Sequence, residues 1–506
     1  MQFQKKGLKK LTYKFSSLDE VQEIKNSVLV FGHFTTIHTG HIRYLKNAGK
    51  KGEQLIVALI GDNTENKYQF SQIERAEGLA SIDLIDKVVL LKKDELNEAI
   101  CKIKPICLVL GKEFEKSNNN VIKKAIKTMR SLGGEVNFDA GVVNYATVDL
   151  LKSTSQQLLD RKFLQFRNAC KRQELSQKNL LNAMDKFHNC NLIVIGDSIL
   201  DQYSACEALG MSAEAPVVVV KELEHKNFIG GAALVAANVS ALGARCDFVS
   251  VVGDDEHAKS LVTELEANNV EHHLVYDNSR PTTFKKRYMV ENQKLFRVSK
   301  LEDDMLAPKI EQKIIKILEK LAPNSNGIIV SDFVYGLITE KILKKLSELA
   351  SKYDLMLFGD LQCSSQVGHV TKFMSYDLLS PNEKEARIAL QDKESGLEAL
   401  AQKLFKKTNC MRLVMKLGAN GFIAYDKSLK KMNIQSFPAL STNPIDVSGA
   451  GDSLLSVMAV GLASKESMMI AGAIGACRAA IAVDTIGNYP IGKEVLKEKL
   501  TQIFNN

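Results

Sequence analysis

The sequence has no long apolar run, no dense block of one charge and few cysteines. No stretch reaches the roughly 18 uncharged apolar residues of a membrane-spanning helix, so no span is predicted. The first residues, MQFQKKGLKKLTYKFSSLDE, are polar and charged and lack the apolar segment of a secretory signal. The 9 cysteines form no C-x-x-C pair and are odd in number, which favours reduced, partly buried thiols. We therefore expect a cytoplasmic protein with no membrane contact.

Charge and length exclude further classes of protein. The formal net charge of +8 is spread over 506 residues as scattered lysine pairs, without aromatic residues between them. This pattern is typical of a solvated surface with a mild attraction for anionic metabolites, and we expect no nucleic-acid partner. With 45% apolar and 25% charged residues, the chain is globular rather than disordered. Its length predicts two or three domains.

Two regions of the chain alternate short apolar runs with helix-forming stretches. In the first, SVLVF, QLIVALIGD, DKVVLL and ICLVLG are separated by helical segments, which predicts a parallel, Rossmann-like sheet covered by helices. The second alternates in the same way from CNLIVIGDSIL onwards. Between them, residues 151–189 contain neither glycine nor proline and are predicted to form a helical linker.

The predicted organisation is an N-terminal extension (1–26), a first α/β domain (27–150), the linker (151–189) and a second α/β domain (190–506). Within the second domain, residues 203–221 and 282–299 are rich in β-branched and aromatic residues at period two. These two segments predict a small antiparallel sheet that projects from the α/β body.

The first chemical motif is FGHFTTIHTGH, at residues 31–41, where an apolar run meets a helix-forming stretch. Such a turn presents free backbone N–H groups to an anion, and Gly40 lets the backbone approach it closely. His38 and His41 can donate to phosphate oxygens as charge develops in a transition state. An ionised phosphate monoester needs no general base to attack, which points to nucleotidyl transfer with release of pyrophosphate. A structural or zinc-binding role is the alternative, but no nearby cysteine or carboxylate pair completes a zinc site.

These residues resemble the nucleotidyltransferase superfamily with an H-x-G-H signature, which includes glycerol-phosphate cytidylyltransferase. Thr35 stands where the family pattern G-x-F-D-x-x-H-x-G-H has aspartate, and the rest of the pattern is met at Gly32, Phe34, His38, Gly40 and His41. The resemblance spans roughly residues 28–160. Through the segments IERA, LVLGKE and KSTSQQLL it implies further nucleotide contacts at Arg75, Gly111, Ser153 and Thr154.

The second motif is DVSGAGDS, at residues 446–453, directly before an apolar helix-forming stretch. The N–H groups of Gly449, Ala450 and Gly451 are expected to be free at the helix start, where they can bind a migrating phosphoryl group. Asp452 is then placed to accept the hydroxyl proton as an alcohol attacks the γ-phosphorus. An aspartate at this position can also be a simple helix cap, but the paired glycines favour catalysis.

A third segment, SPNEKEA, places Asn382 and Glu385 three residues apart at a predicted helix start, so both lie on one face. Their oxygens suit Mg²⁺ held through water beside a triphosphate. A solvated helix turn is the structural alternative for so short a pattern. Its combination with G-A-G-D favours the metal role.

Together these segments resemble the ribokinase-like (PfkB) sugar kinases, over about residues 190–500. GDSILD, GGAALVAANVSALGA, SDFVYG and KLGANG are further matches. The resemblance implies an α/β kinase domain with a small β-sheet lid. It also implies sugar contacts at Asp201, Gly230 and Gly231, and nucleotide contacts at Lys416 and Gly418.

Two departures from that family concern the sugar and phosphate side of the site. Leu234 stands where many members have asparagine. Asp360, Leu361 and Gln362 stand where heptose kinases have D-P-K. The identity of the substrate depends on both positions.

A chain that joins these two kinds of domain resembles the bacterial family that unites a heptose 7-phosphate kinase with a heptose 1-phosphate adenylyltransferase. In that family the kinase comes first, so the domain order is reversed here. The segment FKKRYMVENQKLFRV resembles its sugar-facing β-lid, which implies a homodimer through the lid. Lys285 and Arg287 in this segment either bind a distal phosphate of the sugar or are solvated strand residues. We expect a transferase that uses ATP and Mg²⁺ to phosphorylate a sugar phosphate and then makes an ADP-heptose-like NDP-sugar for a cell-surface glycan.

Two alternatives stay open at this point. The kinase half could be joined to a cytidylyltransferase that acts on an unrelated polyol phosphate, so either ATP or CTP could serve the N-terminal site. One half could also have lost its chemistry and act as a ligand-sensing module, although intact Asp452, Asn382 and Glu385 argue against this for the kinase.

Overall fold

The computed structural model describes residues 14–34, 37, 39–62, 70–92, 94–111, 114, 119–139, 155–291, 293–362, 368–393 and 395–505. The chain divides into two compact units, Met1–Ser153 and Thr154–Asn506. Each unit is built on a mainly parallel sheet with helices on both faces, so the predicted α/β fold class is confirmed. Among the described residues, no helix is long and apolar enough to cross a membrane.

The first unit contains a six-stranded sheet in the order β1-β4-β3-β2-β5-β6, with every pairing parallel. Short valine- and leucine-rich runs form these strands because a parallel sheet is buried on both faces. The strand order reverses between β2 and β5, so these two strands flank the switch point of the sheet. The strands are β1 (Phe15–Ser17), β2 (Ser27–Gly32), β3 (Gln54–Ile60), β4 (Lys87–Leu91), β5 (Cys107–Gly111) and β6 (Glu135–Asp139).

Helices cover both faces of this sheet. On one face, α2 (Thr39–Gly49) and α3 (Gln72–Ala80) pack on side chains such as Val30 and Val57. On the other face, α4 (Leu96–Ile103) and α5 (Asn120–Ser131) pack on Leu29 and Ile56. Neighbouring residues of one strand reach different cores because side chains alternate across a strand.

The first sheet begins within the segment predicted as an N-terminal extension. Phe15 of β1 pairs with Val88 of β4. The short 3-10 turn that follows, Leu18–Glu20, buries Leu18, and Val21 beyond it is buried as well. Both side chains join the core under α4 and α5, so residues 15–21 contribute to the fold of the first unit.

The second unit contains a nine-stranded sheet in the order β11-β10-β7-β14-β15-β16-β17-β18-β19. Pairing is parallel from β11 to β17 and antiparallel for the last two strands. The order reverses between β7 and β14, which makes a second switch point. The strands are β7 (Asn191–Gly196), β10 (Arg245–Val252), β11 (Glu271–Tyr276), β14 (Gly327–Asp332), β15 (Met356–Leu361), β16 (Leu378–Leu379), β17 (Arg412–Lys416), β18 (Phe422–Asp426) and β19 (Asn433–Phe437).

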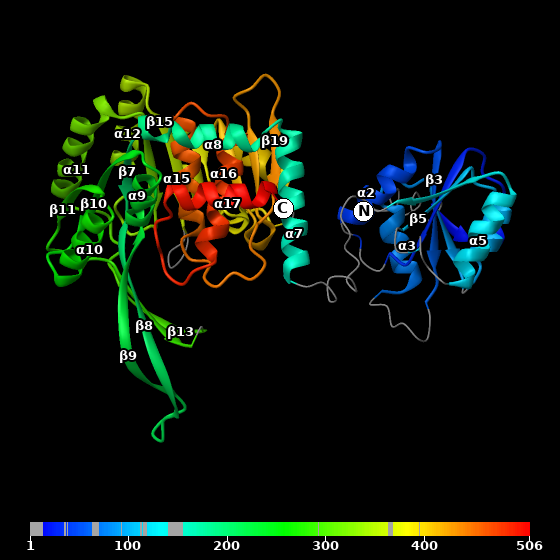
Figure 1. Ribbon diagram of the computed structural model, residues 1–506, viewed down its shortest axis with the longest axis horizontal. Helices are drawn as coiled ribbons and strands as arrows, with labels where there is room; N and C mark the ends of the chain where they lie inside the picture. The colour runs from blue at the N-terminus through cyan, green and yellow to red at the C-terminus, as the bar shows by residue number, and fades with distance from the viewer. Residues whose placement is uncertain are drawn as a thin grey trace, which may run out of the picture. The chain divides into compact units, whose positions relative to one another are not determined.

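Helices also cover both faces of the larger sheet (Figure 1). Two of them, α15 and α16, are buried along almost their whole length, which explains why their sequences are apolar all round. The helices of one face are α7 (Ser155–Arg172), α8 (Gln177–Asp185), α9 (Ala232–Ala241), α10 (Glu256–Ala267), α15 (Ala450–Ala463), α16 (Met468–Val483) and α17 (Lys493–Asn505). Those of the other face are α11 (Pro308–Leu321), α12 (Glu340–Tyr353), α13 (Glu383–Leu390) and α14 (Leu397–Thr408).

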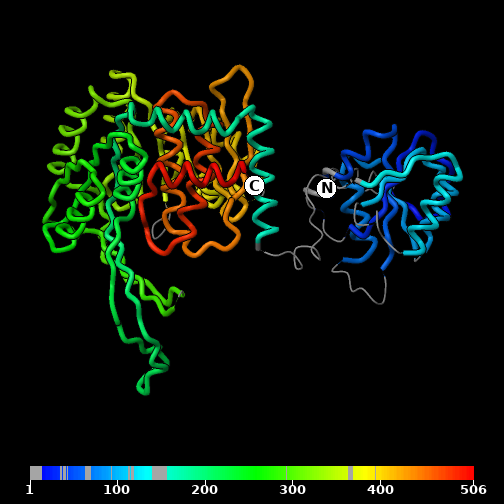
Figure 2. Tube along the Cα trace, in the orientation of Figure 1, coloured from blue at the N-terminus to red at the C-terminus, as the bar shows by residue number. Residues whose placement is uncertain are grey.

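Two of these helices, α7 and α8, come from the segment predicted as a linker. Phe163, Phe166 and Leu180 are fully buried in the same core as α15 and α16. Arg167 Nη1 donates to the carbonyl of Ile503 at 2.7 Å, and Figure 2 shows the C-terminal helix α17 beside α7. Residues 155–185 therefore form part of the second unit and are more than a connection to it.

A four-stranded sheet, the lid, projects from the body of the second unit (Figure 1). Its order is β13-β12-β8-β9, with β8 (Ser198–Met211), β9 (Val218–Gly231), β12 (Phe284–Val290) and β13 (Gln293–Lys300). The sheet was expected to be antiparallel, but β12 pairs with β8 in parallel. The chain reaches β12 through a long crossover that includes α10 and β11, and such a connection allows a parallel pairing where a hairpin does not.

Candidate functional site

The glycine turn of the second unit opens helix α15. Gly449 lies in the left-handed region, at φ +74°, and α15 begins at Ala450, so Gly451 and Asp452 belong to its first turn. A Cβ atom added at Gly449 would lie 2.8 Å from Leu234 Cδ2. Backbone conformation and space both require glycine there, and the first N–H groups of the helix stay available to an anion.

Asp452 is only 4% exposed and sits in a charged cluster. Its Oδ1 accepts a hydrogen bond of 2.8 Å from Gln362 Nε2. Burial raises the pKa of Asp452 to about 7, and the nearby carboxylates of Asp360 and Asp201 add to this rise, whereas Lys416 and Lys285 oppose it. A carboxyl group with a pKa near neutrality can take up and release a proton at physiological pH.

Lys416, at the end of β17, forms a buried ion pair beside this aspartate. Its Nζ lies 2.8 Å and 3.0 Å from the two carboxylate oxygens of Asp360 at the end of β15. Burial alone would lower the pKa of Lys416, but the charges of Asp360, Glu385 and Asp452 raise it above its ordinary value. Lys416 is therefore a permanent cation at neutral pH.

The predicted sugar residues lie at the base of the lid. Asp201 of β8 forms an ion pair with Arg287 of β12, and its Oδ2 accepts a hydrogen bond of 3.0 Å from Asn488 Nδ2. A Cβ atom at Gly230 would stand 2.5 Å from that same oxygen. Gly230 thus leaves room for the Asp201 carboxylate. Gly231, with φ +61°, is the cap residue of α9, and a Cβ atom there would stand 2.4 Å from the carbonyl oxygen of Asp197.

Lys285 is a second buried cation in this region, 3% exposed. Its Nζ lies 5.4 Å from the ring centroid of Phe333 and 5.2 Å from that of Tyr335. The positive charge of Lys285 is among those that lower the pKa of Asp452. The interpretation of Lys285 and Arg287 as solvated strand residues is therefore wrong, since neither side chain is solvated.

Asn382 and Glu385 form a reciprocal cap at the start of α13. The Glu385 N–H donates to Asn382 Oδ1, and the Asn382 N–H donates to Glu385 Oε2, each at 2.8 Å. Within the described parts of the chain, no group of three or more histidine, cysteine or acidic side chains could hold a metal. The donor set suits Mg²⁺, which keeps several waters and uses one or two carboxylates with substrate phosphates.

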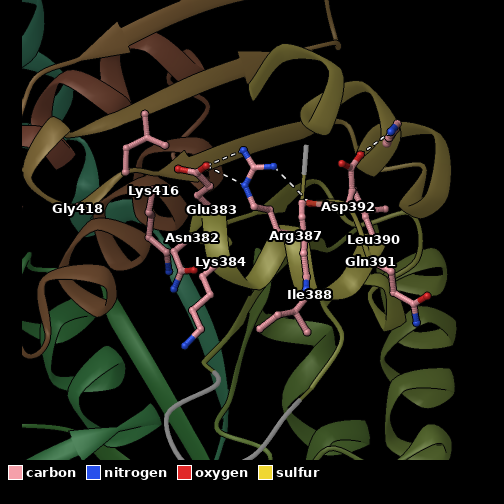
Figure 3. A pocket seen from close by; sticks show the side chains of 13 residues that line it. Asn382, Glu383, Lys384, Arg387, Ile388, Leu390, Gln391, Asp392, Lys416 and Gly418 are labelled. Atoms are coloured by element: carbon pink, nitrogen blue, oxygen red, sulfur yellow. Dashed lines mark hydrogen bonds and ion pairs between the residues drawn. The ribbon is translucent and has the colours of Figure 1, made fainter. Parts of the chain in front are cut away.

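Two hollows meet at Lys416 and Gly418. One, of about 170 Å³, is lined mainly by apolar side chains, among them Phe422, Leu440 and Ala480. The other, of about 1070 Å³, runs along α13 (Figure 3) and contains several cations. An apolar hollow joined to a polar one suits a nucleotide, whose base is apolar and whose phosphates are charged.

Figure 3 shows that some of the cations in the larger hollow are already paired. Arg387 contacts Glu383, with Nη2 2.7 Å from Oε1, and also donates to the carbonyl of Ser395 at 3.0 Å. Lys403 is paired with Asp392. Lys416 is the cation nearest to the glycine turn among the lining residues of this hollow, because a Cβ at Gly451 would be 3.4 Å from its Nζ.

The glycine turn of the first unit lies at the switch point of its sheet. β2 ends at Gly32, and α2 begins at Thr39, so Gly40 belongs to its first turn. The His41 ring packs against the buried ring of Phe34, with centroids 5.1 Å apart. Thr35 and His38 lie outside the described residues.

Arg75 links the ends of the neighbouring strands β2 and β3. Its side chain is 1% exposed and pairs with Asp62 at 2.8 Å. Nη2 also donates to the carbonyl of Ile60 at 3.0 Å, and Nη1 donates to that of His33. Arg75 therefore contacts protein groups after β2 and β3, and its predicted contact with a nucleotide stays a prediction.

The remaining predicted residues of the first site are less fully described. Gly111 ends β5, which pairs with β2 through Val30 and Val109, so it lies beside the end of β2 at the switch point. Ser153 and Thr154 lie outside the described residues. Their predicted roles, and those of the other site residues, stay predictions.

Sequence reasoning gave no role to two residues of the kinase-like cluster. Asp360 was noticed only as the first residue of a D-L-Q departure, yet it holds Lys416. Asn488 gave no signal at all, because no motif marks the GNY segment in which it stands. Only the fold brings it to Asp201, 287 positions earlier in the chain.

An α/β body with a β-lid, and a glycine turn that opens a buried helix beside an aspartate, define the class of a sugar-kinase-like protein. The family model described as "pfkB family carbohydrate kinase" matches residues 190–491. This is more than half of the chain, and the chain belongs to that family. A second model, "Cytidylyltransferase-like", matches residues 29–159. The predicted pairing of the two families, in this order, is confirmed.

Curated relatives match a large part of the chain. "Bifunctional protein HldE" of Campylobacter jejuni subsp. doylei is 31% identical over 309 residues, which are 60% of this chain and 64% of the relative. The protein of the same name from Geobacter sulfurreducens is 30% identical over 322 residues, 63% of this chain and 64% of the relative. The matches thus span just under two thirds of the length of these relatives.

Solved structures share the fold of the second unit's family. Phosphofructokinase-2 from Escherichia coli, in complex with substrates and products, has a TM-score of 0.53 and 16% identity, and covers 62% of this chain and 99% of its own. Ribokinase from Giardia lamblia has a TM-score of 0.50 at 16% identity, with the same two coverages. At such low identity these likenesses establish the fold alone.

Proposed function

We propose that the chain is a bifunctional transferase that phosphorylates a sugar phosphate and then attaches a nucleotidyl group to a sugar 1-phosphate. The observation that supports the kinase reaction best is the buried Asp452 at the head of α15, beside the Lys416–Asp360 pair and across from Asp201. The names of the curated relatives, which call them bifunctional, agree with two activities.

In the kinase reaction, a sugar hydroxyl approaches from the lid side, where Asp201, Gly230 and Gly231 bind the sugar. Asp452 takes the hydroxyl proton as the oxygen attacks the γ-phosphorus, the bond to the bridging oxygen breaks, and ADP leaves. The N–H groups of residues 449–451 hold the migrating phosphoryl group. Mg²⁺, held through water by Asn382 and Glu385, would neutralise charge on the triphosphate.

In the nucleotidyl transfer, a phosphate oxygen of the sugar 1-phosphate attacks the α-phosphorus of a nucleoside triphosphate, and pyrophosphate leaves. The first N–H groups of α2 and the imidazoles of His38 and His41 bind the phosphates. No proton has to be removed from the nucleophile, because a phosphate monoester is ionised at neutral pH. The site would lie in the crevice between the ends of β2 and β5, where open α/β sheets bind ligands.

The sugar is proposed to be a heptose phosphate or a related phosphosugar, and the product an NDP-sugar for a cell-surface glycan. Two cations at the root of the lid, the buried Lys285 and the largely buried Arg287, support a substrate that has its own phosphate group. Arg287 is already paired with Asp201, so Lys285 is the better candidate for a phosphate contact.

The lid is proposed to mediate a homodimer. The β8–β9 hairpin is long and exposes several large apolar side chains, which a second lid could cover. We expect light scattering to give twice the chain mass for the wild type and the single chain mass for Leu223→Asp. The exposed side chains include Leu209, Met211, Val217, Val218 and Leu223.

One experiment tests both reactions. The protein is incubated with ATP or CTP and a panel of heptose, hexose and polyol phosphates, and ADP and pyrophosphate are measured separately. We expect ADP with a phosphosugar as acceptor, and pyrophosphate with the corresponding 1-phosphate. Pyrophosphate from CTP with a polyol phosphate alone would replace the NDP-sugar proposal, and no ADP with any sugar would refute the kinase reaction.

A further inference from the structure

Lys416 occupies the point where the parts of the kinase-like site converge. Its Nζ lies 2.8 Å and 3.0 Å from the two oxygens of Asp360. It would be 3.4 Å from a Cβ atom at Gly451, so it faces the backbone of the glycine turn. The two hollows of the site also share Lys416 among their lining residues.

The backbone around Lys416 keeps this side chain in place. Its N–H donates to the carbonyl of Pro381 at 2.9 Å, and Asn382 pairs with it in an isolated β-bridge. The side chain is 15% exposed, and that of Asp360 is 0% exposed. Both partners are therefore held in one arrangement by buried neighbours, as preorganised charge requires.

Three carboxylates, those of Asp360, Glu385 and Asp452, act on this single ammonium group. A buried ion pair adds little to stability compared with apolar residues of similar volume, because both charges lose their hydration. A lysine among three carboxylates at the head of a helix is thus poorly explained by folding alone. The positive charge of Lys416 is complementary to the negative charge of a triphosphate, and the phosphate oxygens would accept the remaining hydrogen bonds of its ammonium group.

We propose that Lys416 is a catalytic residue, a fixed cation that contacts the migrating phosphoryl group above the 449–451 turn while Asp360 holds it in position. This inference rests on the proposed kinase reaction. Lys416 donates hydrogen bonds to phosphoryl oxygens and transfers no proton, because the neighbouring carboxylates keep its ammonium protonated. Asp360 is a positioning residue that acts through Lys416.

Lys416 has a second effect, on the base. The 2.8 Å partner of the Asp452 carboxylate is the amide of Gln362, which has no charge. Lys416 lowers the pKa of Asp452, whereas Asp360 raises it. Removal of either charge should therefore move the pH dependence of the reaction, and the two removals should move it in opposite directions.

The test uses the full chain and three variants, Lys416→Met, Lys416→Arg and Asp360→Asn, with Lys320→Met as a control at an exposed position of α11. We measure kcat and KM for ATP and for the best phosphosugar between pH 5.5 and 9. Removal of a charged hydrogen bond to the transition state typically costs about 10²- to 10³-fold in kcat. We expect such a loss for Lys416→Met, partial recovery with arginine, and no change for the control.

The pH profiles separate a catalytic role from a structural one. The acid limb of kcat should move to higher pH in Lys416→Met and to lower pH in Asp360→Asn, an opposition that general misfolding does not produce. A loss of less than threefold in the kcat of Lys416→Met would overturn the inference. So would acid limbs of Lys416→Met and Asp360→Asn that shift in the same direction. If the wild type phosphorylates no sugar in the panel, the proposed kinase reaction fails instead. Unchanged pyrophosphate release by the first unit shows that each variant is intact.

Discussion

The two glycine turns of this chain both open a helix, but their surroundings differ in charge. The turn at 449–451 is surrounded by buried ionisable groups, with Asp452 and Lys416 at its head. Beside the turn between Gly32 and Thr39, the His41 imidazole packs at a tilt against the Phe34 ring, and Arg75 is bonded to protein groups. The turn at 449–451 has a buried carboxyl group, Asp452, with a pKa of about 7.

This difference corresponds to the nucleophile that each proposed reaction uses. An alcohol must lose a proton as it attacks phosphorus, so the site that phosphorylates a hydroxyl needs a base whose pKa is close to neutrality. A phosphate monoester is already ionised and needs only donors that stabilise the charge that develops. Four predictions test whether this comparison is correct.

The largest effect is expected for Asp452→Asn. The amide cannot accept the hydroxyl proton, so phosphoryl transfer to sugar should fall by about 10³-fold or more. Release of pyrophosphate from supplied sugar 1-phosphate should not change, because the first unit needs no such base. The two rates are measured on one preparation, as ADP and pyrophosphate. A parallel loss of both would show that the two sites are not separate.

His41→Ala should have the opposite selectivity. Loss of one donor to the developing charge is expected to lower pyrophosphate release by about 10²-fold, while ATP-dependent sugar phosphorylation stays at the wild-type rate. His188→Ala, at an exposed position near the end of α8, is the matched control. Loss of kinase activity in His41→Ala would contradict the assignment of this turn to nucleotidyl transfer.

Arg287→Met tests the sugar side of the kinase site. Without its partner, Asp201 keeps only the hydrogen bond from Asn488 and loses its orientation. We expect KM for the phosphosugar to rise about 10- to 100-fold, consistent with the loss of a charged hydrogen bond, with KM for ATP unchanged. Arg245→Met, at an exposed position of β10, is the control. An equal rise for both substrates would place Arg287 outside the sugar site.

The smallest effect is the pH dependence of the wild-type enzyme. Burial raises the pKa of Asp452 to about 7, and the base acts only when ionised. The kcat of the kinase should therefore fall about tenfold for each pH unit below this value and level off above it. Pyrophosphate release should lack this limb. Rate profiles from pH 5.5 to 9 check both statements, and a kinase rate independent of pH would remove Asp452 as the base.

The motifs allowed candidate residues for both sites to be named, because the residues of each motif are close together in the sequence. Residues 446–453 contain their own turn, helix start and candidate base, and the structure confirms the turn and the helix start. The partners of that turn could not be predicted in the same way. Asp360 comes close to Lys416 because β15 and β17 both pair with β16. Asn488 reaches Asp201 from the segment between α16 and α17, which packing of these helices places near the lid.

The boundaries of the two units were also only partly predictable from the sequence. Residues 15–21 and 155–185 have patterns that identify short strands or helices, but no pattern states which core receives them. Their burial in the two units follows from packing: Leu18 and Phe166 are buried because neighbouring elements leave an apolar surface for them. The parallel pairing of β12 with β8 was missed for a related reason, since pairing direction depends on the route of the chain.

The sequence alone determined the class of fold and the position of the two glycine turns, and it was enough to predict that these turns bind phosphate and that Asp452 is the base, because hydrophobic period, glycine placement and helix capping are local properties. The tertiary structure decided the electrostatics. The pKa of Asp452, the ion pair of Lys416 with Asp360 and the burial of Lys285 depend on charges that lie far apart in the sequence. Charges interact through space and interact most strongly where water is excluded, and only the folded chain defines those places.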